Sequence, residues 1–229
     1  MKTIFNKVHF GLRPLILAAL LVLTLAPFLT ACAPWTVKPI NDEGNAGAQS
    51  AVPGKPGFNA KAYVDSIWQS QVLTTVQDKA ADLPTVLAAL KADPEAAKQK
   101  YGYRQGQSPY NFLVKGEATV DSVDTTTRTG TLKLTVPQAD SSQDVAIQIG
   151  PVIRGTALRD AMPFIQFNMF TNQIEYADVS NAMNDRVLKD VVGKLDTASL
   201  KGKTVAFQGA FTYNPGATIM IVPVKLDTK

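Results

Sequence analysis

The hydrophobic pattern of this chain changes period after Pro109. Up to that residue, apolar side chains recur every three or four positions, as in amphipathic helices. Beyond it they alternate, as in strands with one buried face. Alternation predicts strands at residues 112–120, 132–136, 145–149, 204–213 and 220–226. A helical stretch from about residue 156 to residue 195 separates the third strand from the fourth.

Three strands, a helical insert and two more strands follow the order of an OB-type fold, a five-stranded Greek-key barrel with its helix between strands 3 and 4. We therefore expect a single α+β domain over residues 58–229, with N-terminal helices at 58–102 and an OB-like barrel at 110–229. Another small α+β barrel is the alternative. Pro223 indicates that the fifth strand lies at an edge or contains a bulge, because proline has no N–H for the sheet.

Three side chains mark helix starts before Pro109. Asn59, Asp82 and Asp93 can each accept hydrogen bonds from the free N–H groups of a first helical turn. A proline follows both aspartates within two positions, which suits the start of a helix. Trp68 lies on the apolar stripe of the first helix, so we expect a core residue rather than an exposed stacking platform.

The first 31 residues have the composition of an export signal. Lys2, Lys7 and Arg13 form a positive n-region, and residues 15–29 form an almost wholly apolar run. This run is too short for a comfortable membrane span of roughly 20 residues, and Pro27 interrupts it. We therefore expect residues 1–31 to be a signal peptide.

Leu29, Thr30, Ala31 and Cys32 resemble the lipobox of bacterial lipoproteins, in which an aliphatic residue and two small residues precede a cysteine. The resemblance implies that Cys32 carries diacylglycerol and becomes the acylated N-terminus, with palmitate-like chains as a durable anchor that faces the periplasm. An ordinary secretory signal with a chance cysteine is the alternative. Because Ala33 follows the cysteine where Asp would mark retention in the inner membrane, the resemblance favours the outer membrane.

Residues 32–57 are rich in proline and glycine and contain few large apolar residues. This composition predicts a flexible, lipid-anchored tether. At ~5–6 Å × √n, such a linker would hold the domain roughly 25–30 Å from its anchor. Trp35, close to the lipid, is expected at the membrane interface.

Removal of the signal changes the chemistry that the chain offers. The whole chain has a formal charge of +4, but from residue 32 onward 20 basic residues face 19 acidic ones. A nearly neutral domain lacks the cationic field that nucleic-acid binding needs. The single histidine, His9, leaves with the signal, and the single cysteine is the anchor. This excludes His-based triads, His or Cys zinc sites, thiol catalysis and internal disulfides.

Polar side chains are dense in residues 150–165 and 172–187. The candidate binding residues there are Arg154, Arg159, Asn181, Asn184 and Asp185. They would either line a polar cleft that holds a carboxylate, sugar hydroxyls or a peptide backbone, or form a structural network. In the network, which we favour, the arginines pair with the carboxylates of Glu175, Asp178 or Asp185.

Four segments of the chain resemble a family of predicted periplasmic lipoproteins of unknown function. They are NFLVKGEATV (111–120), IQIGPVIRGTALRDAMPFI (147–165), NQIEYADVSNAMNDRV (172–187) and GKTVAFQGAF (202–211). The similarity extends from about Phe58 to the C-terminus. The resemblance implies a gene located near those of sugar-importing ABC transporters. It therefore also implies a role in carbohydrate uptake, with ABC transporter components as partners. The family offers no catalytic residues to carry over.

No motif indicates an enzyme. A two-carboxylate glycosidase, a Ser–Lys dyad or another unrecognised hydrolase is the alternative, but the acidic residues form no recognisable catalytic pair. Asp121 with Asp124, or Asp140 with Asp144, could bind calcium, yet neither pair follows the EF-hand pattern. We therefore expect no enzymatic activity, no metal and no cofactor.

Two functions without catalysis fit the sequence. The first is a ligand-binding accessory that holds a carbohydrate or a peptide; the second is a structural or assembly protein that docks onto a transporter or another envelope protein. Tyr101, Tyr103 and Tyr110 lie in a loop rich in glycine and glutamine, where their rings could stack on a sugar. Core positions are expected for Phe112, Phe207 and Phe211.

Overall fold

The computed structural model describes residues 49–138 and 143–229. The expected signal peptide, Cys32 and residues 33–48 of the expected tether lie outside this part of the chain. Contacts group residues 46–229 into one unit, to which everything below refers. Among the helices that the structure describes, none combines the length and hydropathy of a membrane span.

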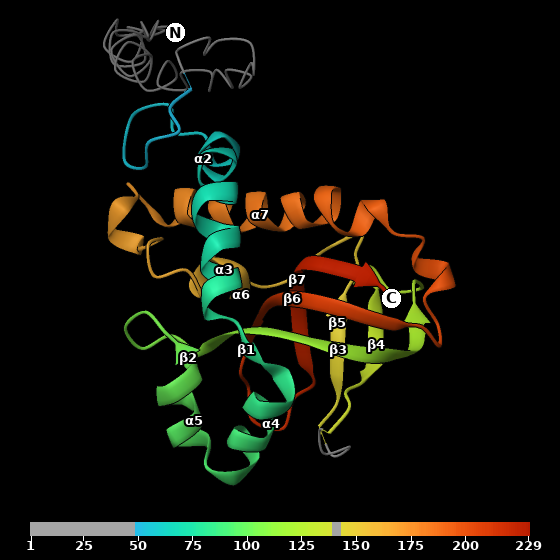
Figure 1. Ribbon diagram of the computed structural model, residues 1–229. Coiled ribbons are helices and arrows are strands. Elements are labelled where there is room, and N and C mark those ends of the chain that lie inside the picture. The colour runs from blue at the N-terminus through green and yellow to red at the C-terminus, as the bar shows by residue number, and fades with distance from the viewer. Residues whose placement is uncertain (1–48, 139–142) are drawn as a thin grey trace, which may run out of the picture. The chain divides into compact units, whose positions relative to one another are not determined.

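Five strands close into a mixed barrel (Figure 1). They are β3 (Asn111–Asp124), β4 (Thr131–Thr135), β5 (Val145–Gln148), β6 (Thr204–Thr212) and β7 (Ile219–Thr228). Neighbours pair in the order β3-β4-β5-β7-β6, and β6 pairs back onto β3 from Asn111↔Thr212 to Thr119↔Thr204. Every pairing in the ring is antiparallel except that of β5 with β7. The OB-like barrel expected from the sequence is confirmed.

The proline in β7 coincides with a bulge and not with an edge. Pro223 pairs with Gly209 of β6, and the register between the two strands shifts next to this pair. Because β7 lies between β5 and β6, it has a neighbour on both sides. The missing N–H of Pro223 is thus tolerated at a local break in the hydrogen-bond ladder.

The helices before the barrel begin at the caps that the sequence predicts. Asn59 accepts a hydrogen bond from the N–H of Ala62 at the start of α2 (Ala60–Ile67). Asp82 caps α4 (Leu83–Ala92) and Asp93 caps α5 (Pro94–Tyr101) in the same way. The first helix continues as a π-helical turn, η2 (Trp68–Leu73), and then as α3 (Thr74–Lys79). In Figure 1, α2, α3 and α4 occupy the teal stretch of the chain, and α5 follows in green.

Two short strands lengthen the sheet along the first half of β3. β1 (Ala81–Asp82) pairs with β3 in parallel, at Ala81↔Val114, and β2 (Gly102–Tyr103) pairs with it antiparallel, at Tyr103↔Asn111. The connections between the helices are thereby attached to the barrel. Because β1 follows α3 and β2 follows α5, both helices end beside the same strand, β3.

Between β5 and β6 the chain forms two helices rather than one continuous helical stretch. The four-residue α6 (Ala157–Asp160) is followed by a loop, a 3₁₀ turn η3 (Phe167–Met169) and the long α7 (Gln173–Asp190). Pro163 explains the break, because proline lacks an N–H and disfavours helical geometry at the residue before it. Short 3₁₀ turns, η4 (Val192–Lys194) and η5 (Thr197–Ser199), lead from α7 to β6.

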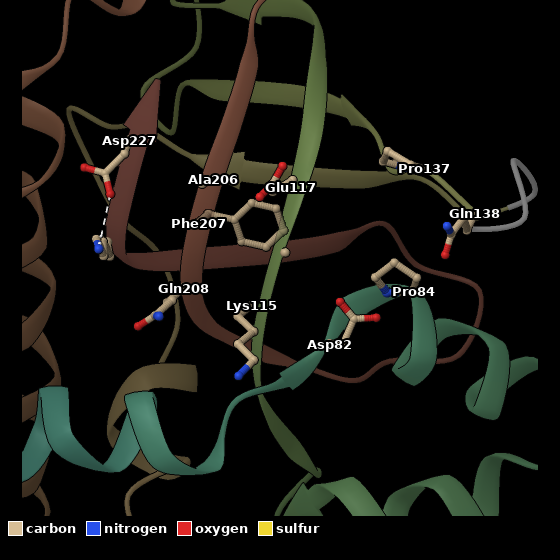
Figure 2. A pocket seen from close by; sticks show the side chains of 12 residues that line it. Asp82, Pro84, Lys115, Glu117, Pro137, Gln138, Ala206, Phe207, Gln208 and Asp227 are labelled. Atoms are coloured by element: carbon tan, nitrogen blue, oxygen red, sulfur yellow. Dashed lines mark ion pairs between the residues drawn. The ribbon is translucent and has the colours of Figure 1, made fainter. Parts of the chain in front are cut away.

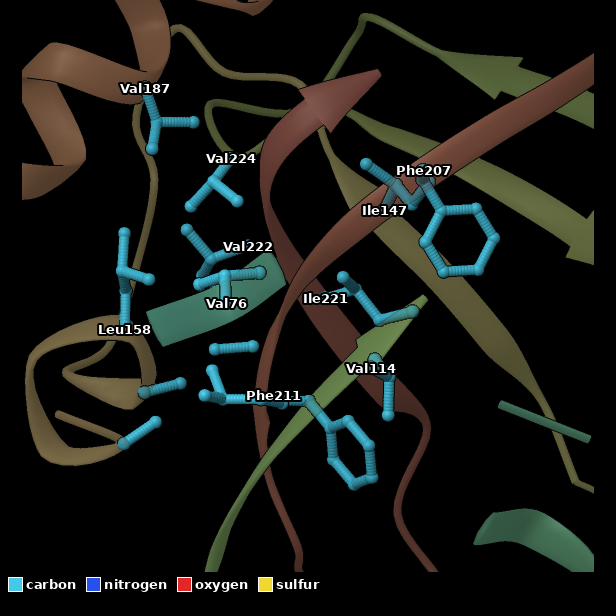
Figure 3. Close-up of a cluster of buried hydrophobic side chains, with 14 of the residues drawn as sticks. Val76, Val114, Ile147, Leu158, Val187, Phe207, Phe211, Ile221, Val222 and Val224 are labelled. Carbon is cyan, nitrogen blue, oxygen red and sulfur yellow. The ribbon is translucent and has the colours of Figure 1, made fainter. Parts of the chain in front are cut away.

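One hydrophobic core joins the helices to the barrel (Figure 3). Val76 of α3, Leu158 of α6 and Val187 of α7 gather around the barrel strands, and all three are at most 1% exposed. Inside the barrel, the rings of Phe112 and Phe211 stack with their centroids 5.1 Å apart. The core positions expected for the three phenylalanines and for Trp68 are confirmed, with no more than 2% exposure each.

The last part of the expected tether is a hydrogen-bonded loop in the structure. The N–H of Ser50 donates to the carbonyl of Gly57, and the N–H of Asn59 donates to the carbonyl of Ser50. A Cβ atom added to Gly54 would lie 3.0 Å from the carbonyl oxygen of Met169. Residues 49–57 therefore pack against the domain, and the tether prediction is left with residues 32–48, outside the described chain.

Candidate functional site

The five candidate residues of the sequence analysis fall into two environments. Arg159 and Asn184 are buried, with 6% and 7% of their surface exposed. Arg154, Asn181 and Asp185 are exposed. Asp185 lines a groove of about 280 Å³ between α2 and α7. The expected cleft is therefore not a single environment that all five residues share.

Arg159 is held in a polar network between α6 and α7. Its guanidinium donates to Oδ1 of Asp160, 2.7 Å from Nη2, and to the carbonyl oxygen of Tyr176, 3.0 Å from Nη1. The same guanidinium lies over the Tyr176 ring, 3.6 Å from its centroid. Burial is the main cause that raises the pKa of Tyr176 to about 12. The Tyr176 hydroxyl therefore stays protonated and donates to Oδ1 of Asp160 at 3.2 Å.

The partner of Arg159 differs from those that the sequence suggested, which were Glu175, Asp178 and Asp185. Arg159 pairs instead with Asp160, its neighbour in the chain. The short helix α6 packs on α7 at the level of Tyr176, so a carboxylate of α6 itself lies within reach. Oε2 of Glu175 accepts a hydrogen bond from the N–H of Thr171, next to the Asn172 cap of α7.

Asn184 fixes the loop that precedes α6. Its Nδ2 donates to the carbonyl oxygens of Gly155 and Ile153, at 3.0 and 3.4 Å. Ser180, which precedes Asn184 on α7, also donates from its Oγ to the carbonyl oxygen of Gly155. In the same loop, the N–H of Arg154 donates to Oε1 of Gln148 at 2.7 Å. The contacts of Arg159 and Asn184 are those of a structural network, which is the interpretation favoured from the sequence.

A groove of about 430 Å³ brings together two of the three tyrosines that the sequence analysis placed in a loop, and we call it the tyrosine groove. In the structure Tyr101 ends α5 and Tyr103 lies in β2, so neither is a loop residue. Its lining residues are Lys79, Ala81, Lys100, Tyr101, Gly102, Tyr103, Asn111, Leu113, Ala161 and Pro163. They come from the ends of α3 and α5, from β1, β2 and β3, and from the residues just after α6. Both tyrosines are half-buried, whereas both lysines are exposed.

The geometry of the tyrosine groove depends on Gly102, which ends α5. A Cβ atom at this position would lie 2.7 Å from the carbonyl oxygen of Lys98 and 2.9 Å from Cδ1 of Tyr110. Only glycine therefore lets the chain pass this closely from α5 into β2. Tyr101 and Tyr103 flank that glycine, and the pairing of Tyr103 with Asn111 holds them beside β3.

The tyrosine groove has a positive character. Its lining includes two lysines and no aspartate or glutamate. Asn111 is 2% exposed, and its amide is held in place: Oδ1 accepts from Oγ1 of Thr212 at 2.6 Å, and Nδ2 donates to the carbonyl of Pro109 at 3.1 Å. Two amphipathic rings beside two cations form a surface that suits a polar ligand with a flat face and an anionic group.

Tyr110, the third loop tyrosine, is engaged elsewhere. Its ring faces the guanidinium of Arg104 at 4.6 Å and the ammonium of Lys98 at 5.7 Å. Its hydroxyl accepts a hydrogen bond from Nε2 of Gln99 at 3.0 Å. Two cations thus lie over the Tyr110 ring, whereas the Tyr101 ring carries one, the ammonium of Lys100 at 5.0 Å from its centroid. Tyr110 is therefore a poorer stacking surface than Tyr101 and Tyr103.

A second groove, of about 540 Å³, lies on the outer surface of the barrel (Figure 2). Lys115, Glu117 and Asp227 lie around the Phe207 ring in this view. The charges neutralise one another: Lys225 pairs with Asp227 at 3.5 Å, and Glu117 pairs with Lys229. Phe207 is only 2% exposed, so it offers no ring face to a ligand. This groove is a weaker candidate for binding.

The face formed by β4 and β5 is where OB-type barrels often bind oligonucleotides and oligosaccharides. Here it carries Lys133 and Thr135 as exposed side chains on β4, and neither strand contains an aromatic residue. Lys133 forms an ion pair with Asp144 at 3.2 Å. Without rings for stacking, this face lacks the main feature of such sites.

Sequence reasoning identified the two groove tyrosines but missed their polar neighbours. Lys79, Lys100 and Asn111 lie on three different elements and meet through the pairing of β1 and β2 with β3. No local sequence pattern predicts that these three residues come together. Within the described residues, no three acidic or other metal-ligating side chains gather as a metal site.

Comparisons with known proteins agree with this fold. The chain is similar to a solved OB-fold protein from Thermotoga maritima, with a TM-score of 0.62 and 20% identical residues. The alignment covers 76% of this chain and 99% of that one, and at this identity it supports the fold alone. No curated protein matches the chain. The model of the family described as predicted periplasmic lipoprotein (DUF2291) matches residues 21–227. With nearly its whole length matched, the chain belongs to this family of predicted periplasmic lipoproteins.

Proposed function

We propose that this protein is a non-catalytic binding lipoprotein that holds a carbohydrate with an anionic group, such as a sugar acid, in the tyrosine groove. The observation that carries the proposal is the pairing of Tyr101 and Tyr103 with two lysines in one groove of about 430 Å³. A volume of this size suits a small-molecule ligand. The rings would stack on the apolar face of the sugar, and Lys79 and Lys100 would attract its carboxylate.

A role beside a sugar-importing ABC transporter is part of this proposal. It rests on what the family resemblance implies, namely genes that lie near those of such transporters. A lipoprotein fixed to one membrane could present a bound sugar to a transporter or hold it in the periplasm. A peptide with a free carboxylate is the second ligand that the same rings and lysines would accept.

Tyr101→Ala and Tyr103→Ala are each expected to weaken sugar-acid binding at least tenfold, about 1.4 kcal/mol, because each removes a stacking ring. The measurement is calorimetry with the lipidated protein in detergent against a panel of neutral sugars, sugar acids and carboxylate-terminated peptides. Tyr213→Ala is the matched control, since this half-buried tyrosine lines a different groove. We expect its affinity to equal that of the wild type.

Three results separate the functions. Binding of sugar acids that both tyrosine variants weaken supports the proposal. Binding of peptides only would identify the other ligand class. The absence of binding to any member of the panel would reject the ligand-binding role and favour the structural or assembly role.

The lipid anchor is tested at Cys32. Cys32→Ser is expected to abolish incorporation of labelled fatty acid and to move the protein from the membrane fraction to the soluble periplasmic fraction, because the acyl chains supply the membrane affinity. Separation of the two membranes by density would then show where the wild type resides; we propose the outer membrane, on the basis of Ala33. A Cys32→Ser protein that still incorporates fatty acid would show that Cys32 is not the acylated residue.

A further inference from the structure

We propose that an apolar patch at the start of the described chain lies on the surface of the lipid bilayer that anchors the protein. The patch consists of Val52, Phe167, Met169 and Ile174, and we call it the apolar end patch. This inference concerns a surface separate from the tyrosine groove. It depends on the lipid anchor, but not on whether the groove binds a sugar.

The four members of the apolar end patch are the large hydrophobic side chains that stand exposed in the described part of the chain. Their exposed fractions are 55% for Val52, 48% for Phe167, 40% for Met169 and 72% for Ile174. Single exposed apolar residues scattered over a surface are ordinary, but a group of them marks a surface for interaction.

Two segments that are distant in sequence bring these side chains together. One is the loop at residues 49–58, and the other is the segment at 167–174. They touch, because a Cβ atom on Gly54 would lie 3.0 Å from the carbonyl oxygen of Met169. The rings of Phe58 and Phe170, one from each segment, also meet edge to face at 5.6 Å. The exposed residues therefore share one end of the domain.

The apolar end patch is supported from behind by packed aromatic rings. Phe170 contacts Tyr63 and Tyr176, with centroids 6.0 and 5.4 Å apart, and Phe167 contacts Tyr176 at 5.5 Å. Tyr176 is in turn held by Arg159. A surface built on such contacts keeps its shape, so its exposed side chains are presented as a group.

The chemistry around the patch suits phospholipid headgroups. Residues 166–174 read QFNMFTNQI and contain no charged side chain, and the loop at 49–58 contains a single charge, Lys55. Amides, hydroxyls and one cation can bind phosphate groups, and these two segments carry no carboxylate that anionic lipids would repel. One carboxylate lies against the second segment: Oε2 of Glu175 accepts a hydrogen bond from the N–H of Thr171.

The position of the anchor selects the bilayer as the occupant. Gln49, where the described chain begins next to Val52, follows Cys32 by 17 positions. Whatever their conformation, these residues span at most about 60 Å, so an anchor at Cys32 would keep Gln49 within that distance of the membrane. Tethering of this kind gives the bilayer a high effective concentration, and a contact of a few apolar side chains becomes sufficient.

The experiment uses the full lipidated chain in vesicles of phosphatidylethanolamine and phosphatidylglycerol. Cys32 is the only cysteine, and its sulfur would carry the lipid, so Asn168→Cys introduces one reactive thiol for an environment-sensitive fluorophore. Asn168 is exposed between Phe167 and Met169, and labelling it leaves the patch intact. Lys201→Cys, exposed in the turn before β6, carries the control label.

With quencher groups on the lipid acyl chains, we expect the label at position 168 to be quenched roughly twofold more strongly than the label at 201. Adding Val52→Ser and Ile174→Ser should reduce this quenching to the level of the control, with an unchanged unfolding temperature. These are the two most exposed members of the patch, at 55% and 72%, so the changes spare the core.

Two results would overturn the proposal. Equal quenching of the two labels would show that the patch stays in water. A label at 168 that is shielded from water but not quenched by lipid would show that a second copy or another protein covers the patch. Either result leaves the sugar-binding proposal untouched, because that proposal is tested by ligand affinity at Tyr101 and Tyr103.

Discussion

Replacing Arg159 with methionine is expected to lower the free energy of unfolding by about 3 kcal/mol, at the lower end of the cost of breaking a buried ion pair. The Arg159 side chain is 7% exposed and that of Asp160 is 15% exposed. The change removes the cation that compensates the Asp160 carboxylate and leaves the carbonyl of Tyr176 without its side-chain donor. Asp160 keeps two partners, the hydroxyls of Thr156 and Tyr176, which moderates the loss.

Chemical denaturation of wild type and variant measures this effect. Arg154→Met is the matched control: the Arg154 side chain is exposed, so we expect a change within about 0.5 kcal/mol. Arg159→Met combined with Asp160→Asn should recover part of the loss, because no uncompensated carboxylate then remains. If Arg159→Met were as stable as the wild type, the network would not hold α6 to α7, and a binding role for Arg159 would return.

The second large effect is expected at Gly209 of β6, which pairs with Pro223 of β7 beside the register shift. A Cβ atom there would lie 2.4 Å from the carbonyl oxygen of Val222 and 2.8 Å from Cγ2 of Ile221. The nearer atom belongs to the backbone of a paired strand, which cannot move aside without loss of register. We expect Gly209→Ala to lower the free energy of unfolding by about 3 kcal/mol, at the upper end of the usual cost of overpacking.

Gly116→Ala is the matched control for this prediction. Gly116 also lies in a barrel strand, but its added Cβ would meet its nearest neighbour, the Phe207 ring, at 3.4 Å, an ordinary contact distance. We therefore expect its stability to stay within about 0.5 kcal/mol of the wild type. Thermal and urea unfolding of both variants compare the two sites directly. Equal stability of the two variants would show that β7 adjusts freely at Pro223.

The starts of the first helices and the order of the strands follow closely from local signals. Helices begin at Asn59, Asp82 and Asp93 because each side chain accepts hydrogen bonds from backbone groups two or three residues away. Strands follow alternation because one buried face requires it. The helical stretch predicted over residues 156–195 is divided into α6 and α7 in the structure, and the sequence itself contains the cause of the break, Pro163.

The candidate site was less predictable, because its contacts cross the fold. The sequence pointed to Tyr101 and Tyr103 through the composition of their loop, but not to the lysines and the asparagine beside them. It indicated Arg159 as a candidate binding residue, but the carboxylates that it suggested as partners do not include Asp160, with which Arg159 pairs. Charged side chains of one helix can reach several carboxylates, and only packing decides which of them lies within 3 Å.

Local chemistry along the chain thus decides the order of the elements and their caps, and it is the basis of the predicted export and anchoring signal, since these depend on residues a few positions apart. Tertiary structure alone decides how the barrel closes. Asn111 pairs with Thr212 across 101 positions, and β5 lies parallel to β7 only because the helices between them return the chain in that direction. The tyrosine groove and the apolar end patch have the same origin: each is made by segments whose meeting depends on the packing of one shared core, which no local pattern encodes.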